Sequence, residues 1–430
     1  MATTTRIAGR AVLNVYVTIS SPNSKILEYS VLTDPGCRPL RTYNVTKADA
    51  RPVLSEHHKI SWDEKKVLVP WEEGKTSNLD HCQCSECRHP ETKQRLIDTF
   101  SIPPTIQAAE VETQEKGLKI TWKNDKHESF YPYEWLHLHS YNPRLQKYLS
   151  PQFRLWGAEI GERPPEISYK EVIESDKGVA KWTSKIYTYG FSYVNDVPVS
   201  PEATQKLVER IALIRHTHYG GFWDFTADLA KKDTAYTDLP LAVHTDNTYF
   251  SDPAGLQLLH LLEHKGDGGM TLLVDGFKAA RILRDEYPDS YRILSNVRVP
   301  SHASGNAGIS IQPFAPFPVL NHHPVDGELM QIRWNNDDRA TMDNWGDSDE
   351  VDRFYEAMRH WDVILSRRDV EYREQLVPGR ALIFDNWRVL HGRTSFTGFR
   401  RMCGAYVNRD DFISRFLMTN TKREVVLNAV

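Results

Sequence analysis

A histidine and an aspartate two residues apart limit what this chain can fold into more than any other feature. If the stretch Val243-His244-Thr245-Asp246 is extended, both side chains point to the same face of one strand. A second histidine from far along the chain, at the end of Phe384–His391, would complete two imidazoles and one carboxylate around a metal. That ligand set leaves coordination positions open and is typical of non-haem iron(II) oxygenases. A bare His-x-Asp triplet also occurs by chance, so it needs support from other residues.

The length and composition favour a protein of two or three domains. The chain has 430 residues, of which 40% are hydrophobic and 26% charged, ordinary values for a protein that buries a sizeable core. The formal net charge of -4 and the lack of a basic stripe argue against a nucleic-acid partner. No apolar run approaches the roughly 18 residues of a membrane span. We therefore expect a soluble protein with no membrane partner.

The cysteines favour a reducing compartment and a metal site. Their number is odd, and three of them, Cys82, Cys84 and Cys87, lie within six positions. No secretory signal precedes them, which argues for metal ligands and against disulfides. Three thiolates suit a tetrahedral structural zinc ion, which needs a fourth ligand. We expect Cys37 and Cys403 to be small core residues.

The N-terminus has two interpretations. Its first 27 residues contain three basic residues and no acid before Glu28, which fits a mitochondrial transit segment. An ordinary N-terminal arm fits equally well, because Val12–Ile19 alternates like a strand. We expect an intracellular protein, in the mitochondrial matrix or the cytoplasm.

The pattern of apolar runs divides the chain into three parts. Residues 1–54 are expected to be an N-terminal extension. Residues 55–160 are expected to form a small zinc-binding β domain, because Val67–Trp71 and Leu118–Trp122 are strand-like runs that each end in a tryptophan. Residues 161–430 alternate strands with helices and are expected to form a larger domain.

Within the larger domain, Ser200-Pro201-Glu202 begins a helix well, with an N-cap, a first-turn proline and an acid near the positive end of the dipole. We expect this helix to continue until Gly220-Gly221. Further helices are predicted at 277–286 and 348–366, and strands at 257–262, 270–274, 381–384 and 400–406. Many strands with a few packed helices favour a mainly β fold with α buttresses, a double-stranded β-helix or jelly roll.

Five motifs occur in order: His244-Thr245-Asp246, Gly268-Gly269-Met270-Thr271, Val274-Asp275-Gly276-Phe277, Asn335-Asn336 and the run 385–393. Their spacing as well as their residue types resemble the family of trimethyllysine and γ-butyrobetaine dioxygenases of carnitine biosynthesis, and the resemblance extends over residues 60 to 415. The resemblance implies an oxygenase that uses iron(II), 2-oxoglutarate, O2 and ascorbate, with His244, Asp246 and His391 as iron ligands. Members of the family pair, so a homodimer is expected.

A 2-oxoglutarate co-substrate needs a cation for its distal carboxylate. Arginine suits this role because its fork binds a carboxylate through two hydrogen bonds and keeps its charge. The candidates are Arg393, Arg400 and Arg401; on an extended strand Arg400 faces the same way as Tyr406, whereas Arg401 faces the other way. The family pattern also places this arginine six positions before the pocket tyrosine, which indicates Arg400. By resemblance, the Thr271 hydroxyl assists the same carboxylate.

A trimethylammonium group has no N–H to donate, so aromatic faces recognise it by cation–π attraction. Four aromatic residues match the cage positions of the family: Tyr219, Trp223, Tyr236 and Tyr406. Most aromatic residues in any chain are core residues, so it is the matching positions that favour a cage.

The opposite end of the substrate separates the two enzymes of the family. Trimethyllysine carries an α-ammonium group, and Asp233 stands where the butyrobetaine enzymes have an amide. A carboxylate there repels butyrobetaine and pairs with an amino acid, whereas Asn336 suits the substrate carboxylate in both cases. We therefore expect hydroxylation of Nε-trimethyllysine at C-3, the first step of carnitine biosynthesis. The alternatives are γ-butyrobetaine hydroxylation and, in another class, a non-catalytic jelly-roll binding module.

The resemblance also implies the fourth zinc ligand. His127 occupies the position of the zinc histidine in the N-terminal domain of the family, whereas His81 and His89 are nearer in sequence but lack that match. A closed site of three thiolates and one imidazole holds a small domain together and does no chemistry.

Overall fold

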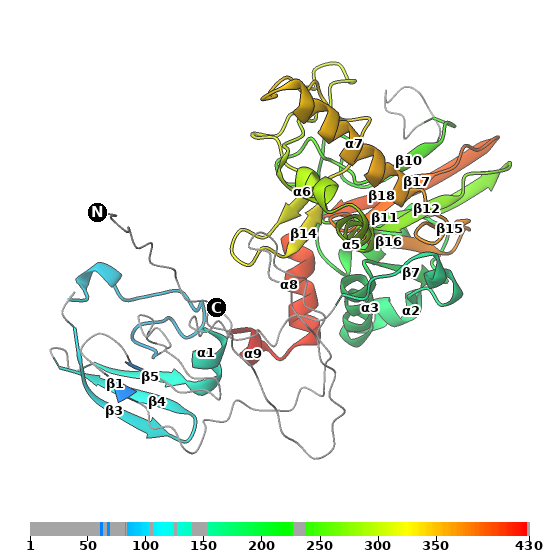
Figure 1. The fold of residues 1–430 in the computed structure, drawn as a ribbon. Helices are drawn as coiled ribbons and strands as arrows, with labels where there is room; N and C mark the ends of the chain where they lie inside the picture. Colours follow the sequence, from blue (N-terminus) through cyan, green and yellow to red (C-terminus); the bar gives the residue numbers. More distant parts are fainter. Residues whose placement is uncertain are drawn as a thin grey trace, which may run out of the picture. The chain divides into compact units, whose positions relative to one another are not determined.

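The computed structural model describes residues 61–62, 67–68, 82, 84–103, 106–123, 127–139, 153–226 and 237–427 (Figure 1). The N-terminal extension 1–54, Cys37, Asp233 and Tyr236 lie outside these residues, so the expectations for them are not tested by the structure. None of the helices in the described part of the chain is long and apolar enough to cross a membrane.

The N-terminal part is built from short antiparallel strands. Its three-stranded sheet pairs β3 (Ala108–Gln114) with β4 (Gly117–Trp122) and β4 with β5 (Glu128–Pro132), and α1 (Tyr133–Leu138) follows. A second pair joins β1 (Ser61–Trp62) to β2 (Val67–Leu68), and a short 3-10 helix lies at Thr99–Ser101. Among the described residues, the apolar core of this part is a small cluster of buried side chains: Ala108, Leu118, Ile120, Tyr131, Trp135 and Leu136.

The large domain contains two main sheets. One has the strand order β6-β7-β16-β11-β18-β8 with β9 beside β18, and the other has the order β10-β17-β12-β15. All pairs are antiparallel except β6 with β7. The bounds in the first sheet are β6 Glu166–Ser168, β7 Phe191–Asn195, β16 Ala381–Asp385, β11 Leu256–Lys265, β18 Phe399–Val407, β8 Ile214–Arg215 and β9 Trp223–Thr226. Those in the second are β10 Leu241–His244, β17 Val389–Arg393, β12 Thr271–Asp275 and β15 Tyr372–Glu374.

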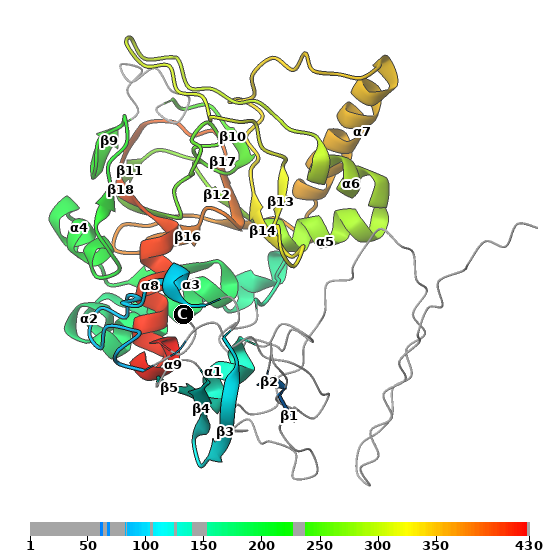
Figure 2. The same cartoon turned by 90° about the vertical axis from the view of Figure 1, so that its left-hand side faces the viewer.

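Helices cover the outer faces of both sheets (Figure 2). The first sheet is covered by α2 (Tyr169–Glu174), α3 (Asp176–Tyr189), α4 (Pro201–Glu209) and α8 (Arg409–Asn420). The second is covered by α5 (Gly276–Glu286), α6 (Pro288–Asn296) and α7 (Ser348–Leu365), together with the hairpin of β13 (Leu320–His322) and β14 (Leu329–Ile332). A 3-10 helix at Ala158–Glu162 precedes β6, and α9 (Arg423–Leu427) follows α8.

Between the two sheets lies a third cluster of buried apolar side chains. It combines Phe191, Phe384 and Met402 from the first sheet with Leu273 and Tyr372 from the second. Alternate residues of each strand therefore point inward and outward, as in two packed sheets that curl around one core. The predicted mainly β jelly roll with helical buttresses is confirmed.

Two local expectations differ from the structure. The helix at Ser200 begins as predicted, with Ser200 Oγ accepting from the Ala203 N–H at 3.2 Å, but α4 ends at Glu209. Ile214 instead enters β8 and pairs with Val407 of β18, because long-range strand pairing overrides local helical periodicity. Residues 153–160 also pack on the large domain, where Trp156 Nε1 donates to the Tyr189 carbonyl at 2.5 Å. We therefore propose that the large domain begins at or before residue 153.

Candidate active site

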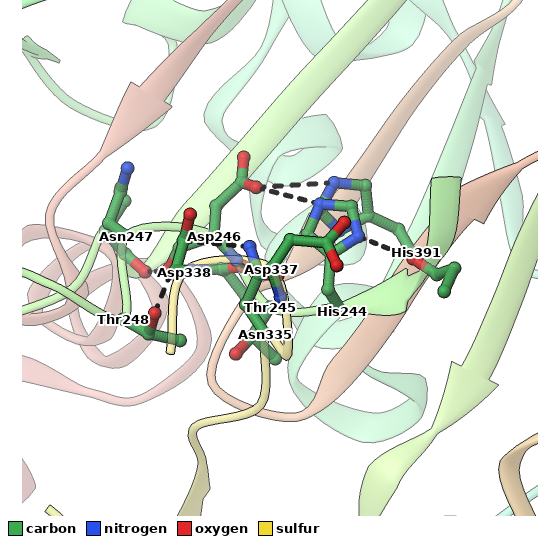
Figure 3. A network of polar contacts seen from close by, with 12 residues as sticks. His244, Thr245, Asp246, Asn247, Thr248, Asn335, Asp337, Asp338 and His391 are labelled. Atoms are coloured by element: carbon green, nitrogen blue, oxygen red, sulfur yellow. Dashed lines mark hydrogen bonds and ion pairs between the residues drawn. The ribbon is translucent and has the colours of Figure 1, made fainter. Parts of the chain in front are cut away.

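Two neighbouring strands of the second sheet bring the predicted metal ligands together. His244 ends β10 and lies opposite His391 of β17, with ring centroids 4.4 Å apart. Asp246 follows two residues later, and its Oδ1 lies 3.2 Å from His244 Nε2 and 3.7 Å from His391 Nε2 (Figure 3). The three ligand atoms lie within 4.8 Å of one another. Two imidazoles and one carboxylate on one face fit a non-haem iron(II) ion.

Backbone and side-chain hydrogen bonds hold this triad in place. His244 Nδ1 bonds to the Ala242 carbonyl oxygen at 2.7 Å, which leaves Nε2 for a metal. Asn386 holds the main chain of Asp246 on both sides: its Oδ1 accepts from the Asp246 N–H at 2.8 Å, and its Nδ2 donates to the Asp246 carbonyl at 3.0 Å. Asn386 is 1% exposed, so the ligand geometry is fixed from within the core.

The charges in the triad affect one another. Burial opposes the charge of Asp246, but His391 and His244 outweigh it and hold the pKa of this carboxyl well below its ordinary value. Burial lowers the pKa of His391 to about 3, and the neighbouring His244 adds to this effect. Burial and the Asp246 charge raise the pKa of Tyr406 well above its ordinary value. A carboxylate, a neutral imidazole and a protonated phenol are therefore favoured at neutral pH, and the first two are metal ligands.

A cavity of about 160 Å3 opens onto the triad. Its wall includes Arg400 and Thr271, as well as Arg393, which donates to the carbonyls of Thr237 and Leu239 at 2.7 Å. Arg400 is 8% exposed and forms no ion pair with any acid that the structure describes, and its Nε has no hydrogen-bond partner there. Burial lowers the pKa of Arg400 to about 10, so the side chain stays cationic at neutral pH. A buried cation that faces a cavity in this way suits an anionic ligand.

Aromatic side chains form another part of the wall. Trp223 and Tyr406 meet edge to face with centroids 4.5 Å apart, and the Tyr219 hydroxyl lies 3.3 Å from that of Tyr249. The sheet explains why they meet: β8 and β9 both pair with β18, which carries Tyr406. Gly404 is required at this crossing, because a Cβ there would clash with the Leu258 carbonyl oxygen and lie 2.9 Å from the Trp223 ring.

The structure adds residues that sequence analysis missed. Tyr249 lines the cavity, although only its position three residues after Asp246 hinted at this. Asn335, Asp337 and Asp338 also line it and lie beside the triad (Figure 3). Asn336 does not; it lines a separate cavity of about 20 Å3. The loop after β14 has no periodicity from which the inward-facing residue could be predicted.

A second group of metal-ligand atoms lies in the N-terminal part. The Sγ atoms of Cys82, Cys84 and Cys87 lie 3.3, 3.5 and 3.3 Å from His127 Nε2. His127 directly precedes β5, whereas the cysteines lie on a turn before β3, so the group joins two segments that are far apart in sequence. Burial and the neighbouring thiols raise the pKa of Cys87 to about 12, and a bound cation would relieve this crowding. Three thiolates and one imidazole fit a closed structural zinc site.

Comparison with known families agrees with this architecture. Residues 146–406 match the family described as taurine catabolism dioxygenase TauD, TfdA family, and residues 58–137 match the N-terminal domain of gamma-butyrobetaine hydroxylase-like proteins. The fold and the site therefore define an iron- and 2-oxoglutarate-dependent dioxygenase. A putative alpha-ketoglutarate-dependent taurine dioxygenase from Burkholderia xenovorans is similar in structure, with a TM-score of 0.44, 12% identity and coverage of 60% of this chain and 91% of that one.

Relatives with similar sequences show to which group within this wider family the chain belongs. The trimethyllysine dioxygenase of Meyerozyma guilliermondii is 44% identical over 90% of this chain and 100% of its own length. That of Neurospora crassa is 47% identical over 82% of this chain and 81% of its own, and the human enzyme, described as mitochondrial, is 41% identical over 78% and 80%. The chain belongs to the trimethyllysine dioxygenases. Human gamma-butyrobetaine dioxygenase is more distant, at 27% identity over 88% of this chain and 98% of its own.

Proposed function

We propose that the protein hydroxylates free Nε-trimethyllysine at C-3, the first step of carnitine biosynthesis. One atom of O2 enters the product, and the other enters succinate as 2-oxoglutarate loses CO2. The observation that carries the proposal is an aromatic cavity beside a two-histidine, one-carboxylate triad, in a chain 44% and 47% identical to two trimethyllysine dioxygenases. Iron(II) held by His244, Asp246 and His391 supplies the oxidative chemistry.

The protein itself positions the two organic molecules. Arg400 pairs with the distal carboxylate of 2-oxoglutarate, and the buried Thr271 hydroxyl on the same cavity wall donates to it. The pair is strong because Arg400 is desolvated and has no competing acid among the described residues. This leaves the keto acid end free to reach the triad.

The substrate lies across the same cavity. Its trimethylammonium group contacts Tyr219, Trp223, Tyr236 and Tyr406, as the resemblance implied. C-3 is bonded directly to Cα, so hydroxylation at C-3 requires the α-ammonium and α-carboxylate groups to lie close to the metal. We propose Asp233 for the ammonium and, in place of the predicted Asn336, its neighbour Asn335 for the carboxylate, because Asn335 lines this cavity. The acids beside the triad, Asp337 and Asp338, contribute a favourable field for the same cation.

A direct comparison of two substrates tests this proposal. Iron-loaded protein is given 2-oxoglutarate, O2 and either trimethyllysine or γ-butyrobetaine, while succinate and the hydroxylated product are measured. We expect stoichiometric succinate and 3-hydroxytrimethyllysine with the first substrate only. Turnover with γ-butyrobetaine alone would assign the protein to the other enzyme of the family. No turnover with either would favour the non-catalytic binding module.

The role of Asp233 can be tested by Asp233→Asn. Loss of a charge-assisted hydrogen bond to the α-ammonium group is expected to raise the KM for trimethyllysine about 10-fold, whereas the KM for 2-oxoglutarate stays unchanged. Steady-state kinetics with each substrate varied in turn measures both. Asp337→Asn is the matched variant, because it removes an acid from the cavity wall. If Asp337→Asn raises the KM for trimethyllysine more than Asp233→Asn does, Asp337 and not Asp233 binds the α-ammonium group.

We propose further properties that follow from the family. The protein acts in the mitochondrial matrix, as the labels of the human and bovine relatives suggest; cell fractionation distinguishes this location from the cytoplasm. It forms a homodimer, which light scattering of the purified chain would detect. Ascorbate keeps the bound iron reduced, so its omission is expected to shorten the linear phase of turnover.

A further inference from the structure

Tyr406 belongs to the aromatic wall and also contacts the metal triad. Its ring meets Trp223 edge to face, and its hydroxyl donates to Asp246 Oδ2 at 2.5 Å. The other oxygen of the same carboxylate, Oδ1, faces the two histidine Nε2 atoms. The two oxygens of Asp246 thus have separate partners: Oδ2 bonds to Tyr406 of the aromatic wall, and Oδ1 faces the two histidines of the metal site.

The other hydrogen bonds of Asp246 fix its main chain, so the rotation of its carboxylate is restrained by Tyr406. Asn386 holds only the main chain of Asp246. Among the residues that the structure describes, Tyr406 is the one donor to Oδ2. A carboxylate without that bond rotates about its terminal torsion with little resistance and can bind a metal through both oxygens, which uses a coordination position that the co-substrates need.

We propose that Tyr406 is a positioning residue for the metal site, in which its hydroxyl keeps Asp246 bound through Oδ1 alone and links occupancy of the cage to metal affinity. The proposal rests on the proposed function, because it takes the triad as the iron site and the aromatic wall as the trimethylammonium cage. A ligand that packs against the Tyr406 ring stabilises the position of the hydroxyl and therefore that of Asp246. Because such coupling is reciprocal, trimethyllysine should tighten metal binding as much as the metal tightens trimethyllysine binding.

Tyr406→Phe tests the hydroxyl while keeping the ring. Tyr219→Phe is its matched control: it removes a hydroxyl from another residue of the cavity wall, one that contacts the Tyr249 hydroxyl. Without substrate, we expect Tyr406→Phe to weaken Mn(II) binding about 10-fold, as loss of a ligand-orienting partner commonly does. We also expect a shifted charge-transfer band of the anaerobic iron(II)–2-oxoglutarate complex. Tyr219→Phe should leave both unchanged.

Wild-type affinity and an unshifted band in Tyr406→Phe would overturn the proposal, as would equal losses in the two variants. If Tyr406→Phe does not fold, as judged by thermal unfolding of the metal-free protein, 3-fluorotyrosine at position 406 replaces it. Its more acidic hydroxyl is a stronger donor and should shift the band, whereas no shift would overturn the proposal. Adding trimethyllysine to the wild type should tighten Mn(II) binding, and this gain should be lost in Tyr406→Phe. The Mn(II) titrations without substrate involve no turnover. Their result therefore stays the same even if trimethyllysine is not the substrate, so failure of this proposal is distinguishable from failure of the proposed function.

Discussion

Replacing Arg400 with methionine is expected to raise the KM for 2-oxoglutarate about 30-fold or more. Arg400 is buried in the cavity wall without an acidic partner among the described residues, so we expect its cation to be neutralised by the co-substrate. Truncating one partner of a buried, hydrogen-bonded charge pair costs about 2–5 kcal/mol, and about 1.4 kcal/mol corresponds to a factor of 10. Steady-state kinetics with 2-oxoglutarate varied at saturating trimethyllysine measures the change.

The neighbouring Arg401 provides a matched control. Its side chain is 42% exposed on the other face of β18 and pairs with Asp224, with Nε donating to Oδ1 at 2.8 Å. An exposed pair of this kind contributes about 0–1 kcal/mol, so Arg401→Met should change the same KM by no more than a few-fold. Equal effects of the two substitutions, or an effect of Arg400→Met on the trimethyllysine KM alone, would contradict the assignment of Arg400.

Cys84→Ser is expected to remove the zinc ion and unfold the N-terminal sheet. Among the described residues, the core of that sheet has few buried apolar side chains, and a core of this size usually needs a metal ion or a disulfide. A structural zinc ion contributes about 10–16 kcal/mol in small zinc-dependent domains. Metal analysis should find one zinc per wild-type chain and none in the variant. Hydrogen exchange over residues 108–138 should become fast, while exchange in the strands of the jelly roll stays slow.

Cys403→Ala distinguishes this effect from general damage to a cysteine. Cys403 is fully buried in β18, as a small core residue was expected to be, and lies outside the group of three thiols and His127. Its replacement should keep the zinc content and the slow exchange of the N-terminal sheet. A Cys84→Ser protein that lacks zinc but keeps a protected sheet would show that the ion does not hold this part together.

Local sequence was enough to predict the elements whose periodicity and end signals agree. The Ser200 cap, the helix at α5, the long helix α7 and the strand at β18 all follow from side-chain spacing and from residues that begin helices. Local patterns failed where a distant segment supplied the hydrogen bonds. Ile214 has helical spacing from Leu207, yet it lies in β8, because its backbone pairs with Val407 of β18. Without that change Tyr219 and Trp223 would not reach Tyr406.

The candidate sites show the same difference between what local sequence predicts and what only the folded structure decides. The residue pattern proposed His244 and Asp246 with the distal His391, because strand parity can be read from the sequence. The resemblance to the family implied the same three ligands and added His127. Asn336 was predicted to bind the substrate, but the loop that carries it has no periodicity, and the structure shows that Asn335 lines the cavity at the triad whereas Asn336 does not.

His244-x-Asp246 with its distal histidine and the thiol cluster could thus be predicted from residue type at a fixed spacing, whereas the trimethylammonium cage was predicted from the resemblance to the family and stays a prediction. The tertiary structure decided how these parts share atoms. Tyr406 could be placed in the cage from its position, but its bond to the outer oxygen of Asp246 joins β18 to the segment after β10, which are separated by 160 residues. Such a contact depends on how two sheets curl around one core, and no local pattern encodes it.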